Sequence, residues 1–312
     1  TLLSLTGENG RMHSFDLERI GSGLVVSQSR DEIERALAAG AAVITAPPGT
    51  GKTTFVPPLA ANALPSGRIL VTQPRRVAVR AAARRIAELD GSPLGGPSGF
   101  TVRGERLVSR DTRIETVTPG VLLRRLLTDP GLDGVAAVVL DEVHERTVDG
   151  DLLLGMLSEV RALRDDLVLV AMSATLDAEP VARLLDAPIV AIGSVLHPLE
   201  ISYAPAVSAR IGARGVERAF LDHLASLAVR EQAAAAHDAL VFVPSARDVD
   251  EVVRRIRDLS GDVEALPLHG RLTAAAQDRA TPGRQPGDPP RIVVSTALAE
   301  SSLTVPGVRL VV

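Results

Sequence analysis

Short, continuously apolar runs alternate along the chain with longer segments in which apolar residues recur at helical spacing. Continuous apolar runs are typical of strands in a parallel sheet that helices cover on both faces. In the first part of the chain we expect five such strands, at residues 41–46, 68–73, 112–118, 135–142 and 167–175. Helical spacing occurs between them, at residues 77–89 and 149–163. This order of strand, helix and strand predicts a doubly wound α/β domain.

The same order returns after an interruption. Residues 192–207 contain a glycine and two prolines, which end regular elements, so we expect the first domain to end there. Further elements are expected at residues 215–236 (a long helix), 239–245, 246–259, 263–268, 291–296 and 308–312. The predicted organisation is an N-terminal extension of open order (1–29), a first domain (30–194) and a second domain (195–312). Because the chain ends in an apolar run, we expect it to be a piece of a longer protein.

Composition narrows the class of protein. A chain of 312 residues can bury two cores, because one domain commonly takes ~150 residues. It contains no cysteine, which excludes a disulfide framework and a thiolate metal site and suits a reducing cytoplasm. No apolar run approaches the ~20 residues that a membrane-spanning helix needs. We therefore expect a cytoplasmic protein with no membrane partner.

Charge is unevenly distributed along the chain. The net charge is −4, so the protein as a whole does not attract a polyanion. Six arginines nevertheless occur without an acid in one strip: Arg68, Arg75, Arg76, Arg80, Arg84 and Arg85. The strip either binds phosphates or forms a solvated helix face, and both interpretations stay open. Aromatic residues make up only 2% of the chain, which argues against base stacking as the main mode of recognition.

Lys52 is the only lysine among the 34 basic residues of the chain. It lies in APPGTGKTT, between an expected strand and an expected helix, and follows the phosphate-loop pattern with Ala46 at the first glycine. Glycines let backbone N–H groups close around phosphate oxygens, and a helix N-terminus favours the same anion. A compact ammonium suits that site better than a planar guanidinium. The alternative is a plain strand-to-helix turn. The residues expected to bind ATP are Pro48, Gly49, Thr50, Gly51, Lys52, Thr53 and Thr54.

Two carboxylates follow the apolar part of the strand expected at 135–142. Desolvating charge is costly, so a buried acidic pair is poorly explained as structure, although a cap for the next helix is the alternative. We expect Asp141 to hold Mg²⁺ partly through water, together with the Thr53 hydroxyl. Glu142 would orient and deprotonate the attacking water. The expected catalytic residues are Glu142, Asp141 and Lys52.

These two segments resemble those of a superfamily-2 helicase, and further motifs agree. TQPRR is similar to the PRRxAA motif of DEAH-type RNA helicases, DEVHER to their motif II, and MSATLD to their motif III. Later segments also resemble the family: VTPGVLLRRL, LVFVPS, LPLHGRL and VSTALAESSLTVPGV. The motifs occur in the family's order over most of the chain, and their residues are most similar to those of the bacterial HrpB-type helicases.

The resemblance implies two RecA-like P-loop domains, the second incomplete, with parallel sheets covered by helices and ATP in the cleft between them. It also implies a partner, single-stranded nucleic acid and most often RNA, with translocation in the 3′-to-5′ direction. The residues implied to contact nucleic acid are Arg75, Arg76, Thr118, Arg124, Ser245 and Thr296. Those implied to couple nucleotide state to that surface are His144, Ser173 and Thr175.

One motif of the family, Q-R-x-G-R-x-G-R, does not occur in these 312 residues and is expected beyond Val312. It supplies an arginine finger, and such a charge contributes about 10³ to 10⁵ in rate. We therefore expect this chain to bind nucleotide but to hydrolyse it weakly. Two other functions stay open. One is a DNA helicase or translocase, because no reader of the RNA 2′-hydroxyl is recognisable; the other is a non-catalytic, nucleotide-gated RNA-binding fragment.

Overall fold

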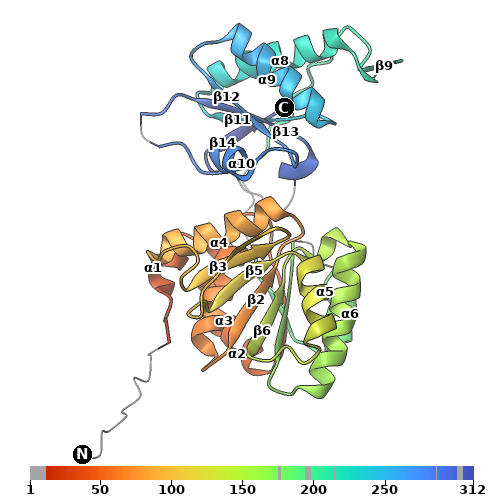
Figure 1. Ribbon diagram of the computed structural model, residues 1–312. Coiled ribbons are helices and arrows are strands. Elements are labelled where there is room, and N and C mark those ends of the chain that lie inside the picture. Colours follow the sequence, from red (N-terminus) through yellow and green to blue (C-terminus); the bar gives the residue numbers. More distant parts are fainter. Residues whose placement is uncertain (1–11, 175–176, 194–197, 214, 286, 301–304) are drawn as a thin grey trace, which may run out of the picture. The chain divides into compact units, whose positions relative to one another are not determined.

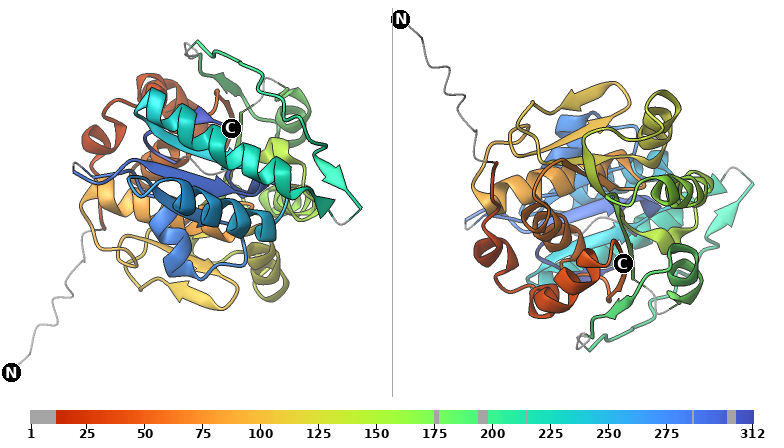
Figure 2. Two further views of the ribbon diagram at one scale, coloured as in Figure 1. Left: turned by 90° about the horizontal axis from the view of Figure 1, so that it is seen from above. Right: turned by 90° about the horizontal axis from the view of Figure 1, so that it is seen from below.

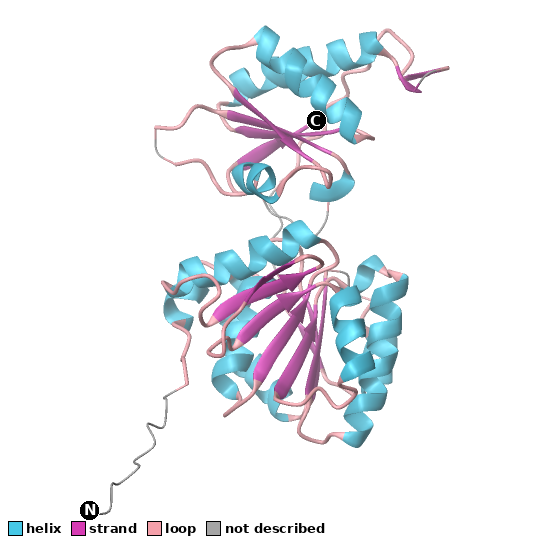
Figure 3. Ribbon diagram, in the orientation of Figure 1, coloured by secondary structure: helices cyan, strands magenta, loops and turns pink. Residues whose placement is uncertain are grey.

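The computed structural model describes residues 12–174, 177–193, 198–213, 215–285, 287–300 and 305–312 (Figure 1). The chain divides into two compact units, Thr1–Val195 and Leu196–Val312. Each unit contains a mostly or wholly parallel sheet covered by helices (Figure 3). The α/β class expected from the continuous apolar runs is therefore confirmed. Among the described helices, none combines the length and the apolar character that a membrane crossing requires.

An eight-stranded sheet forms the centre of the first unit, in the order β4-β3-β5-β2-β6-β7-β1-β8. Neighbouring strands are parallel, except that β3 and β4 pair antiparallel. The strands are β1 (Ala41–Thr45), β2 (Arg68–Thr72), β3 (Ser98–Val102), β4 (Glu105–Leu107), β5 (Ile114–Val117), β6 (Val135–Leu140), β7 (Val168–Ser173) and β8 (Ile189–Ala191). Five of these strands were expected from the sequence, but β3, β4 and β8 were not. β3 contains serine, glycine and threonine, β4 is mostly charged, and β8 has only three residues, so none of them forms a long apolar run.

Both faces of this sheet are buried, which explains why its strands are continuously apolar. In β1, Ala42 and Ile44 belong to one core, whereas Ala41 and Val43 belong to the other. The first core also contains residues of α1 (Leu17–Gly21), the 3₁₀ helix η1 (Val25–Ser29), α2 (Arg30–Ala38), α3 (Lys52–Ala63) and α4 (Arg76–Asp90). The second lies under α5 (Pro119–Thr128), α6 (Val148–Leu163) and α7 (Glu179–Leu185), on the opposite face (Figure 1).

The segment before α2 is part of the first core. Phe15, Ile20 and Val26 are at most 3% exposed and pack with α2 and α3. The sequence left the order of residues 1–29 open, because a short stretch with a few apolar residues has no clear period. The described part of that stretch, from residue 12 onward, is packed against the domain that follows it.

A four-stranded parallel sheet forms the centre of the second unit, in the order β12-β13-β11-β14. Its strands are β11 (Asp238–Phe242), β12 (Glu264–Leu268), β13 (Arg291–Ser295) and β14 (Val308–Val311). Helices α8 (Arg218–Ala235) and α9 (Ala246–Leu259) lie side by side on one face, as the left view of Figure 2 shows. The opposite face packs against α10 (Ala274–Ala280) and η3 (Ala297–Ala299). A short antiparallel pair, β9 (Ile211–Gly212) and β10 (Gly215–Val216), precedes α8.

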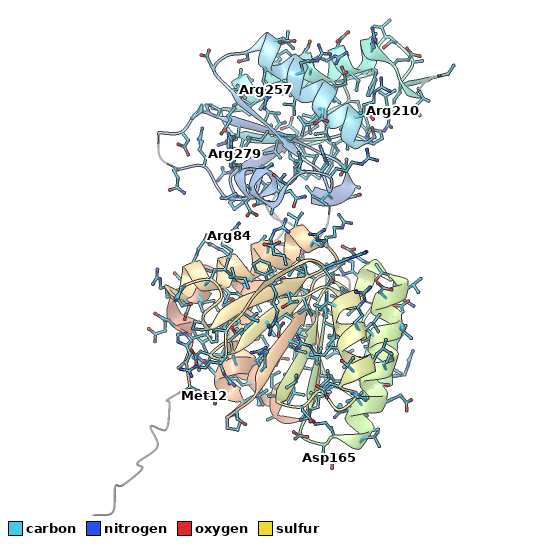
Figure 4. The ribbon with its side chains drawn as sticks, viewed as in Figure 1. Met12, Arg84, Asp165, Arg210, Arg257 and Arg279 are labelled. Carbon is cyan, nitrogen blue, oxygen red and sulfur yellow. The ribbon has the colours of Figure 1, made fainter. Side chains whose placement is uncertain are left out.

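Two arginines of the strip, Arg68 and Arg80, pair with acids of the first unit. Arg68 begins β2, and its Nη1 lies 2.8 Å from Glu115 Oε2. Arg80 is 3% exposed and pairs with Glu105 across 3.5 Å. Arg84 lies on α4 (Figure 4). Strand-to-helix geometry separates these residues, because a strand start and the faces of a helix point in different directions.

Glu115 on β5 is a fully buried acid in the first unit. Its carboxylate accepts hydrogen bonds from Arg68 (2.8 Å), Arg125 (2.9 Å) and Thr101 (2.7 Å). Burial alone would raise the pKa of Glu115. The hydrogen bonds from Arg125 and Thr101, with the charges of Arg125 and Arg68, outweigh burial and hold the pKa below its usual value. The acid thus ties β5 to β2, β3 and α5.

We expect Glu115→Gln to lower the free energy of unfolding by about 1–3 kcal/mol, because it leaves two partly exposed arginines without their acid. A carboxyl with a depressed folded pKa stabilises the fold above its unfolded pKa, and this contribution is lost as pH falls through the folded pKa. The variant should therefore lose less stability than the wild type between neutral and acidic pH. Urea denaturation followed by circular dichroism at several pH values measures both effects. Glu34→Gln, at an exposed pair with Arg30, is the control, and equal losses in the two variants would contradict the assignment.

Candidate functional site

The loop between β1 and α3 has the backbone shape of a phosphate-binding loop. Gly49 and Gly51 have φ values of 78° and 93°, a left-handed region that favours glycine. The Thr50 hydroxyl donates to the Pro47 carbonyl at 2.9 Å. Gly51 is the N-cap of α3, which begins at Lys52. The first N–H groups of a helix have no partner inside it, so this end of α3 can receive an anion.

Leu24 and Val26, in the segment before α2, contact the phosphate-binding loop. The Val26 N–H donates to the Thr50 carbonyl at 3.1 Å. A methyl group placed on Gly51 would lie 2.8 Å from Leu24 Cδ1, so Leu24 packs directly against the glycine. Neither contact was anticipated from sequence, because both residues precede the family motifs.

Lys52 is only 6% exposed, and its ammonium lies inside the loop. Nζ donates to the carbonyls of Ala46 at 2.5 Å and Pro47 at 3.3 Å. Burial lowers the pKa of Lys52, and the charges of Asp141 and Glu142 act in the opposite direction. In this conformation the carbonyls of the loop provide the hydrogen-bond acceptors of the buried ammonium.

Asp141 and Thr53 lie side by side, although 88 residues separate them in the sequence. The Thr53 hydroxyl donates to Asp141 Oδ2 at 2.5 Å, and the Glu142 N–H donates to Oδ1 at 2.9 Å. Burial raises the pKa of Asp141, while hydrogen bonds from Thr53 and the Glu142 backbone oppose that effect. A hydroxyl and a carboxylate are hard oxygen ligands that fit Mg²⁺, which usually keeps waters and takes phosphate oxygens as further ligands. Within the described ranges, no group of three or more His, Cys, Asp and Glu side chains is arranged to hold a metal.

Glu142 follows β6 in a strained backbone conformation. Its φ is 56°, a left-handed value that is uncommon for a residue with a side chain. Burial and the charge of Asp141 raise the pKa of Glu142 to about 7, against the opposing charge of Lys52. A carboxyl that titrates near neutral pH is suited to act as a general base.

The segment after β7 reaches the same cluster. The Ala174 N–H donates to His144 Nδ1 at 3.2 Å, and the same nitrogen lies 3.4 Å from Glu142 Oε2. The Ser173 carbonyl accepts from the Ala46 N–H at 3.2 Å. His144 and Ser173 thus lie among the residues predicted to handle nucleotide. Thr175, the third residue predicted to couple the two sites, lies outside the described residues.

The residues predicted to contact nucleic acid follow neighbouring strands. In the first unit, Arg75 is the N-cap of α4 after β2, and Thr118 is the N-cap of α5 after β5. Arg76 and Arg124 are exposed on those two helices. Arg75 also pairs with Glu145 across 3.9 Å. In the second unit, Ser245 and Thr296 follow the adjacent strands β11 and β13. Arg75, Thr118, Ser245 and Thr296 therefore follow the carboxyl ends of strands, each in the sheet of its own unit.

Gln73 belongs to the cluster of Lys52, Thr53, Asp141 and Glu142, although no role was expected for it from the sequence. It is 1% exposed, and its Nε2 donates to Asp141 Oδ2 at 2.5 Å. The available signal was its position at the end of β2, because the carboxyl ends of adjacent parallel strands lie together. β2 pairs directly with β6, which leads to Asp141.

Two family models match the chain. The "DEAD/DEAH box helicase" model covers residues 28–184, and the "Helicase conserved C-terminal domain" model covers residues 219–312. Among curated proteins, the ATP-dependent RNA helicase HrpB of Escherichia coli is 36% identical over 86% of this chain and 33% of its own length. The ATP-dependent RNA helicase HrpA of the same organism is 36% identical over 93% of this chain and 22% of its own length.

A solved structure agrees with these matches. The crystal structure of the Escherichia coli DEAH/RHA helicase HrpB is 37% identical, with a TM-score of 0.79 over 93% of this chain and 36% of that one. The two units are thus RecA-like domains, as the motifs imply. The chain spans about a third of the length of HrpB. The order of motifs, the fold and the matching family models agree, and the chain belongs to the DEAD/DEAH box helicase family.

Proposed function

We propose that the chain binds ATP with Mg²⁺ on its first unit and belongs to a motor that moves along single-stranded RNA in the 3′-to-5′ direction. The supporting observation is the cluster of Lys52, Thr53, Asp141 and Glu142 at one edge of the sheet. RNA is proposed because the related helicases are named as RNA helicases. The direction rests on the family resemblance alone.

Each residue of the cluster has a distinct proposed task. The backbone of residues 48–54 surrounds the phosphates, and Lys52 turns from the loop carbonyls towards the β- and γ-phosphates. Thr53 and Asp141 hold Mg²⁺, which would neutralise the charge that develops on the phosphates. Glu142, with a pKa near neutrality, orients a water and takes its proton. His144 and Ser173 contact this cluster and would report its state to the rest of the chain.

The activity of these 312 residues on their own is proposed to be weak, because they include no Q-R-x-G-R-x-G-R motif. Nucleotide binding is therefore a better test than turnover. A DNA translocase and a non-catalytic RNA-binding fragment are the competing functions. Parallel assays with RNA, with DNA of the same sequence and without nucleic acid distinguish the three.

We expect Lys52→Ala to weaken binding of a fluorescent ATP analogue at least tenfold, because it removes the one ammonium that faces the phosphates; tenfold corresponds to about 1.4 kcal/mol. Fluorescence anisotropy measures the affinity, and circular dichroism checks the fold. Arg230→Ala removes an exposed positive charge from the second unit and should leave the affinity unchanged. Wild-type affinity in the Lys52 variant would refute the nucleotide site.

The rate of the residual hydrolysis should rise roughly tenfold between pH 6 and pH 8, because Glu142 acts as a base only when deprotonated and its pKa is about 7. Phosphate release at saturating ATP and Mg²⁺ measures this profile. Glu142→Gln should lose both the rate and its pH dependence. A wild-type rate that is flat over this range would contradict the role of Glu142.

Arg75→Ala should weaken binding of a labelled single-stranded RNA and reduce the slope of log K against log salt by about 0.7, because one phosphate contact with a single strand is lost. Fluorescence polarisation at several salt concentrations gives the slope. Arg110→Ala, at a side chain that is 94% exposed, is the control and should change neither value. Running the matched DNA beside the RNA decides which nucleic acid is preferred. An unaltered slope in the Arg75 variant would exclude Arg75 from the contact surface.

A further inference from the structure

Gln73 is a buried amide with one strong interaction and one unsatisfied atom. Its Nε2 donates to Asp141 Oδ2 at 2.5 Å. Its Oε1 is buried and has no hydrogen-bond partner within the described part of the chain. Leaving a buried polar atom without a partner costs free energy. An apolar side chain of the same length would avoid that cost, so packing does not explain the amide. Its interaction with Asp141 does.

The backbone around Gln73 is held on both sides. Its N–H donates to the Val117 carbonyl, at the end of β5, at 2.9 Å. Pro74 follows, and a proline restricts the backbone of the residue before it to extended conformations. The preceding residue, Thr72, is the last of β2 and pairs with both β5 and β6. The side-chain amide is therefore carried by a rigid support.

Gln73 and Thr53 donate to the same oxygen of Asp141 but differ in their other tasks. The Thr53 hydroxyl is itself a proposed ligand of Mg²⁺ and must serve the metal as well as the carboxylate. The Gln73 amide nitrogen, in contrast, is a hydrogen-bond donor and has no lone pair to offer a cation. It can therefore keep its hydrogen bond to Asp141 whether or not a metal and nucleotide are bound. Partners of this kind orient metal-binding carboxylates and tune their affinity for the ion.

We propose that Gln73 is a positioning residue, which holds the Asp141 carboxylate in the orientation that receives Mg²⁺ together with the nucleotide. This inference rests on the proposed nucleotide site and adds to it a residue that takes no part in binding the phosphates. Gln73 also joins the metal site to the loop that carries Arg75.

The test is the Mg²⁺ dependence of nucleotide binding in Gln73→Met. Methionine has a similar length, removes the N–H donor and removes the unsatisfied oxygen. We expect the Mg²⁺ concentration for half-maximal tightening of a fluorescent ADP analogue to rise about 10–100-fold, the usual effect of losing such a partner. Affinity in EDTA should stay at the wild-type value. The melting temperature should change by only a few degrees, because a lost hydrogen bond is offset by the loss of a buried unsatisfied atom.

Gln232→Met is the matched control. Gln232 is 2% exposed, and its amide donates to the His237 carbonyl at 3.2 Å, in the second unit. This variant should leave the Mg²⁺ requirement unchanged. If Gln73→Met does not fold, Gln73→Leu serves in its place.

The outcomes separate this inference from the proposed function. A Gln73 variant with the wild-type Mg²⁺ requirement would overturn the inference alone. Equal weakening with Mg²⁺ and with EDTA, accompanied by a large fall in melting temperature, would assign Gln73 a purely structural role and also overturn it. A wild-type chain that binds no nucleotide under either condition would overturn the proposed site and this inference with it.

Discussion

The Asp141 carboxylate is the point on which the arrangement of the nucleotide site depends. It is 6% exposed, and burial raises its pKa. Hydrogen bonds stabilise a charge in that position. The donors are the Thr53 hydroxyl at the start of α3, the Gln73 amide directly after β2, and the backbone N–H of Glu142. A shift of α3 relative to β6 would remove the Thr53 donor, and a shift of β2 would remove the Gln73 donor. The positions of α3 and β2 relative to β6 therefore determine how Asp141 is hydrogen-bonded.

The parallel sheet supplies that register. Because β2, β5, β6, β7 and β1 run in the same direction, the loops that follow them open at one edge. The phosphate loop, Gln73, Thr118, the acidic pair and Ala174 all lie in those loops. The second unit repeats the arrangement with Ser245 and Thr296 after β11 and β13. One fold rule thus places residues from widely separated motifs beside one another without a dedicated scaffold for each.

Features that depend on residues close together in the sequence could be predicted, whereas contacts between distant segments could not. The strands were predictable because both faces of the sheet are buried, and the phosphate loop because its glycines and lysine are adjacent. The contacts that depend on distant partners were not. The arginine strip looked uniform until Glu115 and Glu105, outside that strip, paired with Arg68 and Arg80. Gln73 and Asp141 are 68 residues apart, and only the pairing of β2 with β6 brings them together.

The contact of Leu24 and Val26 with the phosphate loop has a practical consequence for dividing the chain. The helicase family model begins at residue 28, and a boundary drawn from motifs falls near the same point. A fragment cut there would lack the apolar support beneath Gly51 and the backbone donor to Thr50. The smallest unit that keeps the nucleotide site intact begins upstream of Leu24, within a stretch that carries no recognisable motif.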